Sequence, residues 1–148
     1  MSRVTLVTRL PVPASTAFSL LTDPVHIRSW WAGPGGRVAN VQIDARDAGL
    51  FWIAAVPEGG PGRSDYGCFT CVIPGELIEA DWTHDATRTS RLVIQLVPLG
   101  VQTEVSLHHR DLPDPATREM QEAHWRQAFA ALGAYAETCA ADDIDPDQ

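Results

Sequence analysis

Hydrophobic and polar residues alternate along much of the chain, and this pattern predicts mainly β-strands. Residues 3–10 (RVTLVTRL) alternate in this way, which indicates a first strand whose side chains point to opposite faces in turn. Between residues 37 and 110, further alternating or apolar runs are separated by short links rich in turn-forming residues. The runs are RVANVQID, GLFWIAAV, YGCFTCVI, ELIEADWTH, SRLVIQLV and VQTEVSLHHR. Short links between successive strands predict an antiparallel meander.

Helical signals flank this strand region. Ser15 is suited to cap a short helix at TAFSLL, and Asp23 followed by Pro24 is suited to begin a second one at PVHIRSWW. The glycine- and proline-rich AGPGG then ends that helix. Asp114 and Pro115 begin a long final helix in which apolar residues recur every three or four positions. This stripe contains Trp125, Ala128, Phe129, Leu132, Tyr135, Ala136 and Cys139.

The order of these elements predicts an α+β fold. A sheet with one apolar face and a long amphipathic helix must cover one another. We therefore expect a curved, seven-stranded antiparallel sheet wrapped around the C-terminal helix, with two short helices after the first strand. The chain has 148 residues, which suits one domain, assigned here to residues 1–141, followed by an acidic tail over 142–148. Wrapping a twisted sheet around a helix can leave a cavity between them.

The amino-acid composition argues against several classes of function. The net charge of −8 disfavours binding to nucleic acids, which carry dense negative charge themselves. All eleven basic residues are Arg, so lysine-dependent phosphate loops and Schiff bases are excluded. No apolar run approaches the ~20 residues of a membrane span, and MSRVTLVTRL lacks the apolar centre of a signal peptide. We expect a cytoplasmic protein without membrane contact. A homodimer is compatible with the sequence.

Strand alternation also selects candidate ligand-binding residues. In VQTEVSLHHR, His109 shares a face with Val105 and Leu107, so it is expected to point inward and its neighbour His108 outward. Both faces of GLFWIAAV are apolar, so its orientation stays open. Of the two adjacent tryptophans, one is expected to plug the core and the other to lie over the mouth of the cavity. The candidate ligand-binding residues are Trp30, Trp31, Phe69, Trp82, His109, His124, Trp125 and Phe129.

Structural roles compete with ligand binding at each of these positions. Aromatic residues on a core face usually only pack, and a lone inward histidine usually bonds to a neighbouring strand or helix.

The sequence contains no identifiable catalytic triad, so no catalytic residue, cofactor or metal is predicted. Cys68 and Cys71 form a C-F-T-C pair, but alternation in a strand places the two thiols on opposite faces. Asp44 and Arg46 share a face and are expected to pair with each other or with the turn.

Five segments together resemble a known superfamily. They are LPVPASTAFSLLTDPVHIRSWW, VQIDARDAGLF, YGCFTCVIPGELIEADW, TEVSLHHRDL and AHWRQAFAALGAYAE, and they span nearly the whole chain in order. The chain resembles the START-like (SRPBCC) helix-grip superfamily, within it the family named after the activator of the heat-shock-protein-90 ATPase (AHSA-type), also labelled polyketide cyclase-like. Two positions depart from the family pattern. Ala48-Gly49 replaces a usual Gly-Gly pair, and His124 replaces a common glycine, which would narrow any opening beside the helix.

The resemblance implies a fold more directly than a function, and three hypotheses follow from it. The first is a binding protein that encloses a small hydrophobic or aromatic molecule between sheet and helix. The second is a polyketide cyclase or aromatase that uses His109 or His124 as acid–base. The third is a chaperone co-factor, which predicts a filled core and an exposed interaction patch. The lack of a catalytic constellation favours the first over the second. The third is weakened because the family's chaperone activator works with an additional domain.

Overall fold

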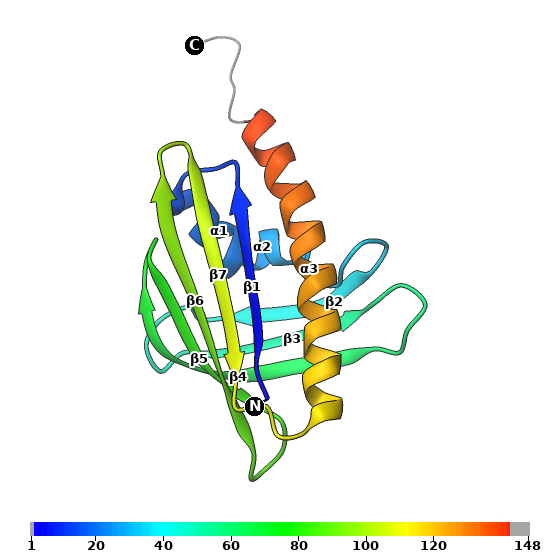
Figure 1. Ribbon diagram of the computed structural model, residues 1–148. Helices are drawn as coiled ribbons and strands as arrows, with labels where there is room; N and C mark the ends of the chain where they lie inside the picture. Colours follow the sequence, from blue (N-terminus) through cyan, green and yellow to red (C-terminus); the bar gives the residue numbers. More distant parts are fainter. Residues whose placement is uncertain (1, 143–148) are drawn as a thin grey trace.

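A single antiparallel sheet curls around one long helix (Figure 1). The computed structural model describes residues 2–142. The strands are β1 (Val4–Leu10), β2 (Arg37–Ile43), β3 (Leu50–Val56), β4 (Arg63–Ile73), β5 (Leu77–Thr83), β6 (Thr89–Leu99) and β7 (Gln102–Arg110). The helices are α1 (Ala14–Thr22), α2 (Pro24–Ile27) and α3 (Pro115–Asp142). The α+β helix-grip prediction is confirmed.

The strand order is β1-β7-β6-β5-β4-β3-β2, a meander from β2 to β7 closed by β1 beside β7. In Figure 1, β2, β3 and β4 lie across the direction of β1, β6 and β7, and α3 runs over the hollow that this bend creates. The helix and the inner face of the sheet can therefore bury their apolar residues against each other. Of the acidic tail expected over 142–148, Asp142 ends α3 and the remainder lies outside the described residues.

Alternation predicts the inward face of most strands correctly. On β7, Val105, Leu107 and His109 are all buried. The strand left open, β3, turns Phe51 inward and leaves Leu50 exposed. Gly67 on β4 lies opposite Phe51, and a Cβ at Gly67 would come within 2.8 Å of the Phe51 ring. The missing side chain at Gly67 thus makes room for this aromatic ring on the inner face.

Helix ends match the sequence prediction in two of three cases. Asp23 accepts a hydrogen bond from the Val25 amide at 2.9 Å, and Asp114 accepts one from the Thr117 amide at 2.7 Å, so both caps are confirmed. The prediction of Ser15 as a cap was wrong. Helix α1 begins at Ala14 after Pro13, and no side chain caps it.

The second short helix is shorter than predicted, because α2 ends at Ile27 and does not reach Trp31. Even so, the Trp31 amide donates to the carbonyl of Ile27 at 3.0 Å, which keeps the chain coiled for another turn. The next residues, including Gly33 at φ +78°, then lead into β2. Both tryptophans therefore lie in turns after the helix.

A bulge in β4 overturns the prediction for the two cysteines. The register with β5 shifts between Phe69 and Cys71, so Cys68 lies opposite Asp81 and Cys71 lies opposite Glu79. Because Asp81 and Glu79 are two residues apart on one strand, they share a face. Both cysteines therefore lie on the same outer face of the sheet, and the prediction of opposite faces was wrong. Both are free thiols.

The connection from β2 to β3 contains a residue in a strained backbone conformation. Ala48 has a φ of +67°, in the left-handed region, where a side chain costs about 1–2 kcal/mol and glycine costs almost nothing. We expect Ala48→Gly to raise the free energy of unfolding by about 0.5–1 kcal/mol, after allowing for the greater freedom of glycine in the unfolded chain.

The neighbouring glycine supplies a matched control. A Cβ at Gly49 would lie 1.9 Å from the carbonyl oxygen of Asp44, so Gly49→Ala should destabilise the protein. Urea unfolding of both variants measures the two effects. Equal destabilisation by both substitutions would contradict the assignment of strain to Ala48.

Candidate functional site

Four aromatic side chains form a cage between the sheet and α3. Trp31 stacks nearly parallel to Trp82, with ring centroids 5.9 Å apart and an angle of 16° between the rings. It meets Trp125 edge-on at 5.3 Å, and Phe51 contacts Trp82 at 5.2 Å. The cage encloses an apolar cavity of about 40 Å³, whose wall also includes Phe69 and Ala80. Aromatic side chains from four separate elements of the chain thus meet around one small space.

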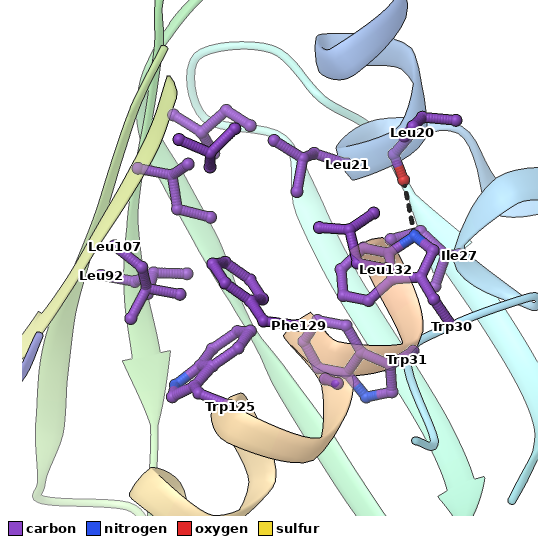
Figure 2. Packing of buried hydrophobic residues seen from close by; sticks show 14 of the residues in the cluster. Leu20, Leu21, Ile27, Trp30, Trp31, Leu92, Leu107, Trp125, Phe129 and Leu132 are labelled. Carbon is purple, nitrogen blue, oxygen red and sulfur yellow. Dashed lines mark hydrogen bonds between the residues drawn. The ribbon is translucent and has the colours of Figure 1, made fainter. Parts of the chain in front are cut away.

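The two adjacent tryptophans occupy different environments. Trp30 is fully buried, and its Nε1 donates to the carbonyl oxygen of Leu20 at 2.9 Å (Figure 2). Trp31 is also buried, but its Nε1 has no hydrogen-bond partner among residues 2–142. In Figure 2, Phe129 and Trp125 project from α3 between these indoles and Leu92 of the sheet. Both indoles line the cavity, and Trp30 is in addition held by α1. Neither indole is exposed in the way expected of a residue over the cavity mouth.

A chain of hydrogen bonds fixes the protons of the inward histidine. Trp125 Nε1 lies 3.0 Å from His109 Nδ1, and an indole nitrogen can only donate. Nδ1 must then be unprotonated, so the neutral ring carries its proton on Nε2. That nitrogen lies 2.7 Å from Ser90 Oγ and donates to it. The Ser90 hydroxyl donates in turn to His84 Nε2, also at 2.7 Å.

Burial keeps these histidines neutral. It lowers the pKa of His109 to about 3, and repulsion from His84 and Arg63 adds to the effect. Burial also holds the pKa of His124 well below its usual value, with further contributions from Arg63 and His109. The pKa of His84 is lowered by burial and by Arg88. At neutral pH the site therefore contains uncharged imidazoles.

Two polar residues of this region escape the sequence analysis. Arg63 donates to both carboxylate oxygens of Asp65, at 3.0 and 2.7 Å, and Asp65 is only 4% exposed. Both lie before the predicted strand YGCFTCVI, in what was expected to be a link, but β4 begins at Arg63. Ser90 was also missed, although in SRLVIQLV it alternates with Leu92 and Ile94 and so shares their inward face. That alternation was the signal available for Ser90.

His124 lies where α3 passes the cage. Its ring centroid is 4.8 Å from that of Trp31 and 5.0 Å from that of Trp125. The residue is half-buried, but its Nε2 is enclosed and has no hydrogen-bond partner within the described part of the chain. The same holds for Oε1 of Gln121, one turn earlier on α3. Residues 2–142 likewise provide no hydrogen-bond partner for the enclosed Nε1 of Trp31.

Five of the eight candidate ligand-binding residues line the cavity: Trp30, Trp31, Phe69, Trp82 and Trp125. The other three, His109, His124 and Phe129, are absent from its wall and pack against aromatic rings that form it. Phe69 packs against Phe51 at 5.4 Å, and Phe129 packs edge-on against both Trp125 and Trp30. Tyr135, also expected to point inward, is half-buried and contacts His26 Nδ1 through its hydroxyl at 2.7 Å. Arg46 pairs with Asp44 at 2.7 Å, as predicted. No cluster of metal-binding side chains occurs among residues 2–142.

A second hollow, of about 930 Å³, lies largely on the outer face of the sheet. Its wall includes the exposed residues Leu50, Trp52 and Tyr66, and Trp52 lies directly opposite Tyr66 in the register of β3 with β4. The hollow is open to solvent. The sequence analysis did not identify it, because the orientation of β3 was left open.

Comparison with known proteins places this architecture in a family. Residues 11–137 match the family model described as "Activator of Hsp90 ATPase homolog 1-like protein". The chain belongs to this family. No curated protein matches this AHSA1-like chain at the level of sequence. None of the helices within residues 2–142 is long and apolar enough to cross a membrane.

Solved structures show the same fold. A protein from Chromobacterium violaceum has a TM-score of 0.81 and 23% identity, covering 92% of this chain and 97% of its own. The AHSA1 protein from Silicibacter pomeroyi has a TM-score of 0.76 and 22% identity, with coverages of 92% and 98%. An Hsp90 activator from Plasmodium falciparum has a TM-score of 0.69 and 17% identity, with coverages of 86% and 90%. At these identities the likeness concerns the fold alone.

Proposed function

We propose that this AHSA1-like protein binds a small molecule with an apolar or aromatic body between the sheet and α3. The observation that carries the proposal is the cavity walled by Trp31, Trp82, Trp125 and Phe51 in the middle of the buried core. Such a wall offers large contact areas to a flat ring, and aromatic side chains lose little conformational freedom on binding.

Binding requires the site to open. The cavity of about 40 Å³ is far smaller than the several hundred Å³ typical of ligand pockets. We expect Trp31 and His124 to move when the site opens. Trp31 lies in the turns after α2, and His124 is half-buried on α3 and packs against Trp31. A ligand that displaces them selects an open form of the protein, and its affinity is reduced by the rarity of that form.

Native mass spectrometry of the gently purified protein tests the proposal. A reproducible extra mass that disappears on denaturation, and a compound of that mass in a solvent extract, would support it and identify the ligand. Two negative results together would overturn the proposal. The purified protein would carry no such mass, and neither its tryptophan fluorescence nor its unfolding temperature would respond to a panel of single- and double-ring aromatic compounds.

Filling the cavity provides a mutational test. We expect Ala80→Val to abolish binding of any ligand identified in this way, because two added methyl groups occupy part of the space beside Trp82. Stability should change by less than about 1 kcal/mol, since the existing cavity accepts part of the added volume. Ala54→Val adds the same groups on the outer face of β3 and should leave binding unchanged. Calorimetric titration of both variants measures the difference.

A chaperone-interaction role is a second candidate, favoured by the exposed patch of Leu50, Trp52 and Tyr66 and by the structural likeness to an Hsp90 activator. It predicts that purified Hsp90 binds the protein and that Leu50→Ser weakens this binding. Val101→Ser, at an exposed turn remote from the patch, is the control. The cyclase hypothesis is not favoured for His109, because both of its ring nitrogens are engaged by Trp125 and Ser90. It is not favoured for His124, because burial holds the pKa of that ring well below its usual value.

A further inference from the structure

The outer face of the sheet carries a row of neighbouring side chains that runs from β3 to β7. In the strand registers, Leu50 is paired with Cys68, and Cys68 with Asp81. Asp81 is paired in turn with Arg91, and Arg91 with Arg110. Each of these residues is next to a buried residue of its own strand, so all of them point to the outer face. The row therefore begins at an apolar side chain and ends at two adjacent guanidinium groups.

The two ends of this row border two adjoining hollows. The apolar end lies in the open hollow of about 930 Å³, whose wall also contains Trp52 and Tyr66. The arginine end lines a polar hollow of about 250 Å³. The hollows meet between β5 and β6, because Thr83 in the wall of the first is the strand partner of Thr89 in the wall of the second. We name the following residues the outer strip: Leu50, Trp52, Tyr66, Arg91 and Arg110.

The two arginines of the outer strip have capacity for an external anion. They lie directly opposite each other on neighbouring strands, and like charges in that position destabilise a sheet. Asp81 compensates only one of them, accepting from Arg91 Nε at 3.0 Å. Within residues 2–142, Arg110 forms no ion pair, not even with Asp111 in the same hollow. A carboxylate from another molecule would supply the missing negative charge.

We propose that the outer strip binds an extended segment of a partner protein, which presents an aromatic or aliphatic residue and, about three to six residues away, one or more carboxylates. The inference deepens the chaperone-interaction candidate and rests on it. Strands lie about 4.8 Å apart, so Tyr66 is about 10 Å across the sheet from Arg91, and Leu50 about 19 Å from Arg110. An extended chain advances about 3.3 Å per residue, which gives the stated spacing.

Other occupants fit the outer strip less well. Small molecules favour concave sites that bury most of their surface, whereas this strip is open and extends from β3 to β7. A nucleic acid would be repelled by the net charge of −8, and a second copy of this chain would be repelled for the same reason. An acidic, partly apolar protein segment complements both ends of the strip.

Peptide selection tests the proposal without knowledge of the partner. Random peptides of about twelve residues, displayed on phage, are long enough to cross the outer strip. We expect the peptides that the protein retains to combine aromatic or aliphatic residues with Asp or Glu at the stated spacing. The tightest one is then compared with a form in which Asn and Gln replace its acids. That amide form should bind at least about 10-fold more weakly in calorimetric titrations, and added salt should weaken it less than the acidic form.

Substitutions in the outer strip assign the contacts. Arg91→Gln and Arg110→Gln should each weaken binding of the acidic peptide about 3- to 10-fold and leave binding of its amide form unchanged. Arg126→Gln removes the same charge from an exposed site on α3 and should change neither affinity. Both peptides should also shift the indole N–H resonance of Trp52, which is identified by its loss in Trp52→Phe.

The outcomes separate this inference from the interaction role on which it rests. Selected peptides without acids, or acidic peptides whose affinity is unchanged in Arg91→Gln and Arg110→Gln, would overturn the carboxylate contact, while Hsp90 binding that Leu50→Ser weakens would still support the role. Failure to select any peptide would overturn the proposed segment, and failure of Hsp90 to bind as well would overturn the role. Self-association that is lost in Arg110→Gln would replace the partner segment by a second copy. Acidic peptides that are sensitive to both strip arginines and insensitive to Arg126→Gln would support the inference.

Discussion

Acidification from pH 7.5 to pH 5 is expected to lower the free energy of unfolding by about 2 kcal/mol through His109 alone. The folded pKa of about 3 lies below the unfolded value of about 6.5. The stabilising contribution is therefore fully present above pH 6.5 and is lost as the pH falls from 6.5 towards 3, because the unfolded chain takes up the proton first. His124, whose folded pKa is also lowered well below its usual value, adds a loss of the same sign.

Burial is the main cause of the low pKa of His109. We expect the hydrogen bond from Trp125 to act in the same direction. Protonation of His109 would place an N–H on Nδ1 opposite the indole N–H, so two donors would face each other across 3.0 Å. Urea unfolding at several pH values measures the effect. His109→Gln should reduce the pH dependence, whereas His108→Gln, on the opposite face of β7, should retain that of the wild type. An unchanged slope in His109→Gln would contradict the assignment.

Alternation and capping signals predict the parts of this fold that depend on local sequence. The inward position of His109, the start of α3 at Pro115 and the meander from β2 to β7 all follow from residues close in the chain. The pairing of β1 with β7 joins residues about a hundred positions apart and does not. The Cys68–Cys71 prediction failed because a bulge adds one residue to β4 without any glycine or proline at that point. Periodicity within one strand cannot reveal a register shift against its neighbour.

The candidate site was predictable in most of its aromatic residues, but not in Phe51, whose strand could not be oriented, nor in its size or polar chemistry. Trp82, Trp125 and the Trp30-Trp31 pair stand out in the sequence because large apolar side chains on a predicted inward face must meet somewhere. The cavity volume depends on how the rings interlock, and that geometry involves residues far apart in the chain. The bonds from His109 to Ser90 and to Trp125 likewise join β7 to β6 and α3, so no local pattern encodes them.

The largest expected loss of stability follows from Trp125→Ala. Trp125 is 1% exposed, packs against Trp31, Trp82 and Phe129, and donates to His109. Removing the ring should cost about 3–5 kcal/mol through lost burial and the cavity left behind. Leaving His109 Nδ1 without its donor adds about 1–3 kcal/mol. Urea unfolding at neutral pH measures the sum, and a loss below about 2 kcal/mol would contradict the central position assigned to this ring.

Trp125→Phe separates packing from hydrogen bonding at the same position. Phe retains most of the apolar contact and removes the indole donor, so we expect a smaller loss of stability, about 1–3 kcal/mol. It also frees His109 Nδ1 to take up a proton without facing another N–H, so the pKa of His109 should rise and the acid sensitivity of the protein should fall. Trp30→Phe removes an indole that bonds to Leu20 and not to His109. That variant should be destabilised but keep the wild-type pH dependence. If both variants showed the same pH dependence, the bond from Trp125 would not be what keeps His109 neutral, and burial alone would account for its low pKa.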